Sequence, residues 1–137
     1  MATTIDVVHY NVRAESDFGY SQAIKSGELI HVSGQLSLDE TGMFVHDHDV
    51  TAQLKQTYAD MDKVLDHYTV SRKQVISQTL YVVDLRRNAA RRGATADGNL
   101  AYFGDHRPVS TVLGISELTF PGQVIEISCI VDTRLPA

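Results

Sequence analysis

The sequence predicts an α+β fold in which helices pack on one face of a sheet. One observation is an amphipathic helical stripe that begins after Asp49. Another is a strongly apolar strand near the C-terminus, over residues 123–131. A third is the order of the predicted elements, β-β-β-α-β-α-β-β, in which long helices follow strands. Together these features favour an α+β sandwich with the helices on one face of the sheet.

The first third of the chain is predicted to be mostly β. Residues 5–10 are rich in Ile and Val and predict a first strand. Residues 21–25 and 29–34 flank the turn signal Ser26-Gly27-Glu28, which predicts a hairpin. After a turn at residues 39–42, residues 43–45 predict a short edge strand.

The remaining elements alternate between helix and strand. Asp49 is a suitable N-cap, because its carboxylate can accept backbone N–H bonds. The apolar stripe that follows recurs at steps of four and three residues: Val50, Leu54, Tyr58, Met61, Leu65 and Tyr68. Residues 75–83 predict a long strand, Asp84 is a candidate cap for a second helix, and residues 109–115 predict another strand.

Composition bounds the functional class. The 137 residues suit one compact domain over residues 1–137, and the net charge of -5 argues against a dedicated nucleic-acid binder. The single cysteine, Cys129, lies in an apolar run and is expected to be a core residue. No signal peptide and no apolar run of about 20 residues is evident, so we expect a cytoplasmic protein with no membrane partner.

Glu126 is the residue in the sequence that most strongly suggests chemistry. It lies in the middle of the strand Val124–Val131, where alternation puts Ile125, Ile127, Cys129 and Val131 on one face and Glu126 on the other. A carboxylate in such a strand is costly unless it is hydrogen-bonded, and desolvation raises its pKa. The pattern therefore predicts either a proton-transferring base or a structural carboxylate at an interface.

Four short segments resemble the RidA family, also called YjgF or the reactive-intermediate deaminases. They are Gly19-Tyr20-Ser21-Gln22-Ala23, Val32-Ser33-Gly34-Gln35, Arg107-Pro108-Val109-Ser110-Thr111-Val112 and Val124-Ile125-Glu126-Ile127. The resemblance implies a mixed sheet with two helices on one face (a chorismate-mutase-like fold), a homotrimer, and clefts between subunits that bind a small molecule. It implies no cofactor, and we expect none and no metal.

The resemblance also assigns site residues. In the family, a glutamate in the strand that corresponds to Glu126 positions the attacking water, a tyrosine in the position of Tyr20 lines the cleft, and the backbone near Ser33 and Gly34 contacts the substrate. Gly34 is equally consistent with a turn or a β-bulge.

The same resemblance makes the absence of an arginine shortly after Pro108 informative. Members that hydrolyse 2-imino acids carry an arginine in a Pro-x-Arg-Ser segment, where it holds the substrate carboxylate. Here Val109 precedes Ser110, and Val109 offers no donor. Arg107 is the nearest substitute but would be displaced by roughly 6–7 Å along a strand. Ser110 and Thr111 remain as neutral donors.

Three functions stay open at this stage. The leading hypothesis is a RidA-like protein that binds a small metabolite in its clefts and hydrolyses, if it is catalytic, a different imine or enamine. An active enamine/imine deaminase of the ordinary kind is the second. The third is a non-catalytic regulatory module, or an endoribonuclease or translation inhibitor, whose only support is the basic block Arg86, Arg87, Arg91 and Arg92. Nucleic acid is therefore not the expected partner.

Overall fold

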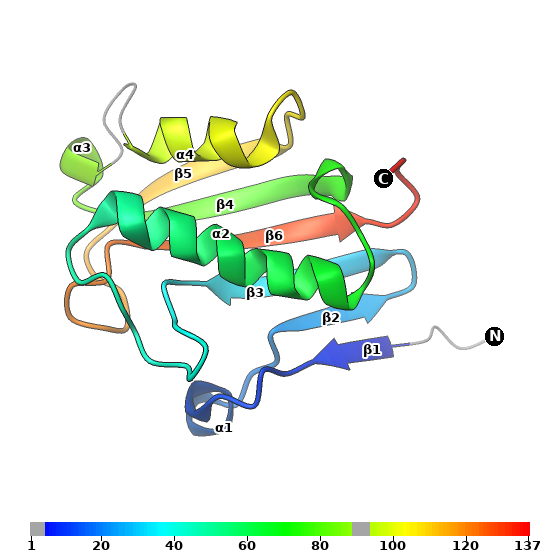
Figure 1. Ribbon diagram of the computed structural model, residues 1–137, viewed down its shortest axis with the longest axis horizontal. Helices are drawn as coiled ribbons and strands as arrows, with labels where there is room; N and C mark the ends of the chain where they lie inside the picture. Colours follow the sequence, from blue (N-terminus) through cyan, green and yellow to red (C-terminus); the bar gives the residue numbers. More distant parts are fainter. Residues whose placement is uncertain (1–4, 89–93) are drawn as a thin grey trace.

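Six strands form one sheet in the order β1-β2-β3-β6-β4-β5 (Figure 1). The computed structural model describes residues 5–88 and 94–137. The strands are β1 (Ile5–Val8), β2 (Ala23–Ser26), β3 (Leu29–Gln35), β4 (Val75–Val83), β5 (Val109–Ile115) and β6 (Ile125–Asp132). The β4–β5 pair is parallel and every other neighbouring pair is antiparallel, so the predicted mixed sheet is confirmed.

Two helices cover one face of this sheet, as the sequence predicts. These are α2 (Val50–His67) and α4 (Ala94–Phe103), which lie in front of the strands in Figure 1. The Asp49 side chain accepts the Ala52 N–H at 3.0 Å, which confirms it as the cap of α2. Among the described residues, no helix combines the length and the apolar character needed to cross a membrane.

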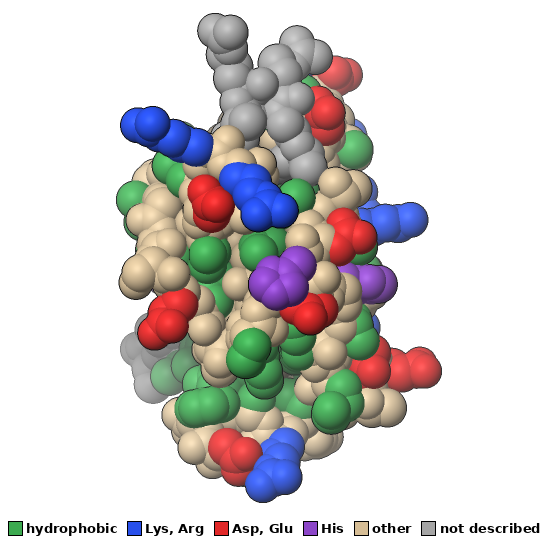
Figure 2. Space-filling model, turned by 90° about the vertical axis from the view of Figure 1, so that its left-hand side faces the viewer, with side chains coloured by type: hydrophobic (Ala, Val, Ile, Leu, Met, Phe, Trp, Pro, Cys, Tyr) green, Lys and Arg blue, Asp and Glu red, His purple; other side chains and the backbone are tan. Residues whose placement is uncertain are grey.

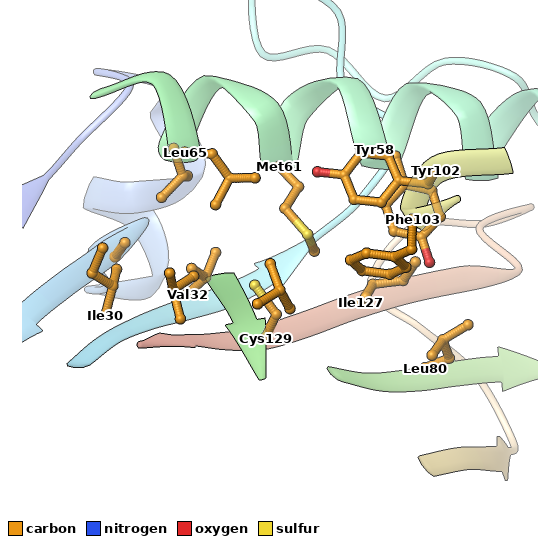
Figure 3. Close-up of a cluster of buried hydrophobic side chains, with 14 of the residues drawn as sticks. Ile30, Val32, Tyr58, Met61, Leu65, Leu80, Tyr102, Phe103, Ile127 and Cys129 are labelled. Atoms are coloured by element: carbon orange, nitrogen blue, oxygen red, sulfur yellow. The ribbon is translucent and has the colours of Figure 1, made fainter. Parts of the chain in front are cut away.

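The core lies between α2, α4 and the sheet (Figure 3). Met61 and Leu65 point from α2 towards the strands, and Tyr102 and Phe103 reach in from the end of α4. Ile125, Ile127, Cys129 and Val131 face this core and are buried, whereas Glu126 lies on the other face of the sheet. The alternation expected for this strand is therefore confirmed.

Two shorter elements were not predicted. They are α1 (Arg13–Phe18) and the 3₁₀ turn η1 (Arg72–Gln74). Residues 43–45 do not form the predicted strand, although the turn predicted at residues 39–42 is present and Asp39 accepts the Thr41 and Met43 N–H groups there. A single bridge between Leu38 and Phe44 is all that remains of that pairing.

Among the described residues, the region of the predicted second helix contains α3 (Leu85–Asn88) and α4. Asp84 has a positive φ of 51°, and its backbone carbonyl accepts the Arg87 and Asn88 N–H groups at the start of α3. The long helix in this region is α4, ten residues that end at Phe103. Of the basic block, Arg86 and Arg87 are exposed, and Arg91 and Arg92 lie outside the described residues.

Candidate active site

An irregularity in β3 brings Gly34 against Glu126. Val32 pairs with Cys129 and Gln35 pairs with Ile127, so three steps on β3 match two on β6. The extra residue is a β-bulge, which turns the Gly34 position towards the Glu126 side chain. A Cβ atom at position 34 would lie 2.3 Å from Glu126 Oε2. The interpretation of Gly34 as part of a β-bulge is therefore confirmed, whereas the contact of its backbone with a substrate stays a prediction. The absence of a side chain at Gly34 also makes room for the Glu126 carboxylate, which the sequence did not predict.

The Glu126 carboxyl group is half-buried, and burial is the main influence on its pKa. Desolvation raises the pKa above its ordinary value, and a hydrogen bond from Gln123 opposes that rise. The bond joins Gln123 Nε2 to Glu126 Oε1 at 3.3 Å. A carboxyl group tuned upwards in this way can hold or release a proton closer to neutral pH than an exposed glutamate can.

Glu126 borders a cavity of about 260 Å³. Its walls come from α1, the end of β3 with the residues that follow it, and the loop before β6. They are mainly apolar: Ala14, Phe18, Leu36, Leu38 and Phe120, with Tyr20, Ser33, Gly34 and Thr119. Figure 2 views the end of the molecule where these loops meet, and hydrophobic side chains gather in its lower part, over α1. Among the described residues that line the cavity, none is a Lys, Arg or His.

Tyr20 separates this cavity from a second one of about 240 Å³. Its hydroxyl group hydrogen bonds with the Gln22 side chain, and burial raises its pKa, with Glu15 and Glu126 adding to the rise. Tyr20 therefore remains a neutral donor at any physiological pH. The second cavity contains Asp60 and Lys63, whose side chains form an ion pair at 3.0 Å.

The structure thus brings four of the predicted site residues together. Tyr20, Ser33, Gly34 and Glu126 all line the same cavity. The Ser33 hydroxyl donates to the Ser21 carbonyl at 2.5 Å, so it braces the segment that carries Tyr20. These residues come from three separate parts of the chain, and only the pairing of β3 with β6 unites them.

The β5 residues lie elsewhere in the protomer. Glu126 pairs with Tyr81 on β4, and Tyr81 pairs with Leu113 on β5, four residues beyond Val109. Val109 is therefore displaced from Glu126 by two strands and four residues, about 10 Å across the sheet and about 13 Å along it. Thr111 shares the face of Val109, whereas Ser110 faces the helices, where Gln78 Nε2 donates to its hydroxyl at 3.1 Å.

Arg107 does not approach Glu126 within the protomer. Its guanidinium group donates to the carbonyls of Gly104 and His106, at the end of α4, and the residue is exposed. Cations near a helix C-terminus are favourable because carbonyl groups there lack partners within the helix. Within the protomer, Arg107 thus closes the end of α4.

Sequence reasoning missed three residues at this site. Phe18 and Phe120 form walls of the cavity, and Gln123 donates a hydrogen bond to Glu126. A buried glutamine before a strand carries no pattern that separates it from a surface residue. Residues 46–49 form the loop that leads into α2. Among the described residues, no group of three or more His, Cys, Asp or Glu could hold a metal.

We expect Gly34→Ala to disable the site and leave the fold intact. The new methyl group would overlap a flexible carboxylate rather than the backbone, so Glu126 must move. A displacement of about 1 Å at a reacting group can reduce turnover roughly 100-fold. Turnover and thermal unfolding of the variant would be measured side by side. In the Gly34→Ala/Glu126→Gln double variant, the alanine should cost no further activity, and an additive loss would contradict this account.

Comparison with known proteins identifies the family of this chain. The sequence profile described as Endoribonuclease L-PSP matches residues 11–133, nearly the whole chain. The chain belongs to this family. A RutC family protein of Pyrococcus abyssi is 33% identical over 100 residues, which cover 72% of this chain and 75% of that protein.

Solved structures agree on the fold. A Mycobacterium tuberculosis member of the YjgF/YER057c/UK114 family has a TM-score of 0.81 at 24% identity, covering 94% of this chain and 99% of its own. A Yersinia pestis member of the conserved Rid protein family also has a TM-score of 0.81, at 23% identity, covering 94% and 99% of the two chains. The RidA/YjgF resemblance seen in the sequence is therefore confirmed.

Proposed function

We propose that this RidA-family protein is a homotrimer that hydrolyses a small imine or enamine lacking a carboxylate, in clefts between its protomers. The observation that carries the proposal is the Glu126 carboxyl group, half-buried beside Gly34 in an apolar cavity. A carboxyl group whose pKa is raised by burial is suited to general acid–base catalysis near neutral pH.

The proposed reaction uses Glu126 twice. The carboxylate accepts a proton from a water molecule as the water oxygen attacks the carbon of the protonated imine, which gives a neutral carbinolamine. The protonated carboxyl group then donates this proton to the carbinolamine nitrogen. The C–N bond breaks as the carbinolamine hydroxyl group becomes the carbonyl and releases its proton to solvent. The products are a carbonyl compound, ammonia and that proton, and Glu126 returns to its ionised form. An enamine enters the same route when a proton from solvent adds at carbon and gives the protonated imine.

A second protomer would complete the cleft through β5. This strand is the last in the sheet, and six of its seven residues are exposed. Val109, Val112 and Leu113 expose 69%, 45% and 43% of their surface, which is unusual for the apolar residues of a strand. An edge strand with unpaired backbone groups and apolar side chains is a surface suited to association. Placed beside a neighbour's Glu126, it would present Val109 and Thr111 to the ligand.

Val109 indicates the substrate class. A guanidinium group at this position would hold a carboxylate by paired, charge-assisted hydrogen bonds. Each hydrogen bond to a charged group contributes roughly 1.5–3 kcal/mol, so its absence weakens 2-imino acid binding about 10- to 100-fold. The cavity beside Glu126 has no cationic lining residue within the described chain that would replace it. A neutral imine carries no such requirement.

Ammonia release from two freshly generated imines tests the proposal. One carries a carboxylate beside the C=N bond and the other carries an alkyl group of similar size. We expect the native protein to favour the neutral imine, and Val109→Arg to shift the preference towards the 2-imino acid at least 10-fold. Leu100→Arg is the matched control, because it adds the same charge at an exposed apolar residue outside β5 and outside the cavity of Glu126.

Three outcomes would redirect the proposal. A preference of the native protein for the 2-imino acid would mean that another group replaces the arginine. Absence of turnover on both imines, with ligand binding retained, would favour a regulatory module. Sedimentation of the native protein as a monomer would remove the cleft itself. RNA cleavage is a poorer candidate, since the net charge is -5 and RNA binding requires a basic surface.

A further inference from the structure

We infer that two buried glutamines, Gln53 and Gln123, are positioning residues that hold Glu126 in its cavity. Neither glutamine was singled out by the sequence. Gln53 is fully buried in the first turns of α2, and Gln123 is 3% exposed just before β6. A buried primary amide must find partners for its donors and acceptor, and the partners of these two amides all lie on the segment that leads to Glu126 or on the loop beside it.

Gln53 fixes the backbone on both sides of Gln123. Its Nε2 donates to the Gly122 carbonyl at 2.8 Å, and its Oε1 accepts the Val124 N–H at 2.9 Å. The same Nε2 donates to the His46 carbonyl at 2.8 Å, which ties in the loop that precedes α2. One helical side chain therefore determines where residues 122–124 lie relative to the core.

Gln123, whose backbone Gln53 holds in place, contacts the Glu126 side chain directly. Its Nε2 donates to Glu126 Oε1 and to the Ile125 carbonyl, both at 3.3 Å. Its Oε1 accepts the Phe120 N–H at 3.3 Å, so the same amide also holds a wall of the cavity. Phe120 is supported from the other side by Phe44, whose ring stacks on it with centroids 5.4 Å apart.

The arrangement has a consequence for the proton that Glu126 carries. A hydrogen bond donated to a carboxylate stabilises its ionised form and lowers its pKa, and the Gln123 amide is the group that does so here. Burial acts in the opposite direction. Removing the Gln123 amide, or releasing the backbone that carries it, leaves desolvation unopposed.

The inference rests on the proposed role of Glu126, but its test needs no turnover. The chain has five glutamates, at positions 15, 28, 40, 117 and 126, so selective ¹³C labelling of glutamate carboxyl groups gives five signals to titrate by NMR. The signal that disappears in Glu126→Gln identifies Glu126. Titration of this signal gives its pKa directly, even if no substrate is ever found.

We expect Gln123→Met to raise the Glu126 pKa by roughly 0.5 to 1, the effect of losing a weak charge-assisted hydrogen bond. Gln53→Met should raise it by a smaller amount, and Gln53→Glu, which keeps the acceptor for Val124 but loses both donors, is the alternative if the methionine variant does not fold. Gln56→Met is the matched control, since that amide lies on the same helix but bonds to Leu38 and Asp60.

If Gln123→Met folds and its Glu126 pKa equals that of the native protein, the inference is wrong for both glutamines. If the Gln53 variants fold and their Glu126 pKa equals the native value, the inference is wrong for Gln53. It is also wrong for Gln53 if Gln56→Met raises the Glu126 pKa as much as Gln53→Met does. Where turnover is measurable, the acidic limb of its pH profile should move to higher pH with the NMR titration. A loss of activity that only follows the folded fraction would indicate a purely structural role.

Discussion

Glu126→Gln is expected to lower imine hydrolysis by roughly 100- to 10,000-fold, the usual contribution of a positioned general acid–base group. Glutamine fills nearly the same space beside Gly34, so the cavity should keep its shape while losing the group that accepts and returns the proton. Steady-state ammonia release would measure the loss. Glu117→Gln, an exposed change outside the cavity, is the control and should retain native turnover.

The same variant should gain stability, and the pH at which it does so is predictable. Burial raises the pKa of Glu126 in the folded protein. The folded protein therefore binds the carboxyl proton of Glu126 more tightly than the unfolded chain does, in which the pKa of this group is about 4.5. The favourable contribution is complete below that pH and is lost as the pH rises through the folded-state value. Near pH 7 the ionised carboxylate therefore weakens the fold.

Thermal unfolding at several pH values checks this linkage. Glu126→Gln should have a higher melting temperature than the native protein near pH 7, and the difference should shrink towards pH 4. A variant that is both inactive and more stable is typical of a residue kept for function rather than for folding. A variant less stable than the native protein near pH 7 would show instead that Glu126 is a structural carboxylate.

Among the variants proposed for this protein, Met61→Ala is expected to lower the free energy of unfolding the most, by about 2–5 kcal/mol. Met61 is fully buried, and its side chain reaches from α2 to the middle of the sheet (Figure 3). The truncation removes apolar contacts and leaves a cavity between two layers that cannot easily close. Its cost should therefore exceed that of a surface change several-fold.

Denaturant unfolding at a fixed protein concentration measures this loss and avoids confusion with changes in assembly. Lys55→Ala, an exposed change on the same helix, should alter the free energy of unfolding by less than about 0.5 kcal/mol. Equal effects of the two substitutions would mean that α2 contributes little to the core.

Much of the fold could be predicted because it follows from local periodicity. The stripe from Val50 to Tyr68 and the alternation along β6 each repeat a period that only one type of element satisfies. Elements without such a period were missed or misplaced. The six-residue helix α1 has no apolar stripe. Residues 43–45 have the composition of a strand but make only the Leu38–Phe44 bridge after the turn that Asp39 closes.

The candidate site was only partly predictable. Glu126 could be singled out because a carboxylate interrupts an apolar strand, and the resemblance to the RidA family connected it with Tyr20 and Gly34. The bulge that brings Gly34 against Glu126 depends on the register between β3 and β6, which no local pattern reports. Gln53 lies 73 positions before Glu126, and its role is defined by partners on distant loops.

The order of residues alone determined the type of fold, the face of β6 that enters the core, and Glu126 as the carboxylate that interrupts an apolar strand. These three depend on side-chain chemistry and on spacing along one element, which are properties of the chain itself. The absence of an arginine at Val109 gained its meaning from the resemblance to the RidA family. Tertiary structure decided which distant groups meet: a glycine that admits the carboxylate, two amides that hold it, and a β5 strand left exposed at the sheet edge. Such contacts form only when segments far apart in the chain pack together, because hydrogen bonds and steric fit act over a few ångströms of space and not over sequence distance.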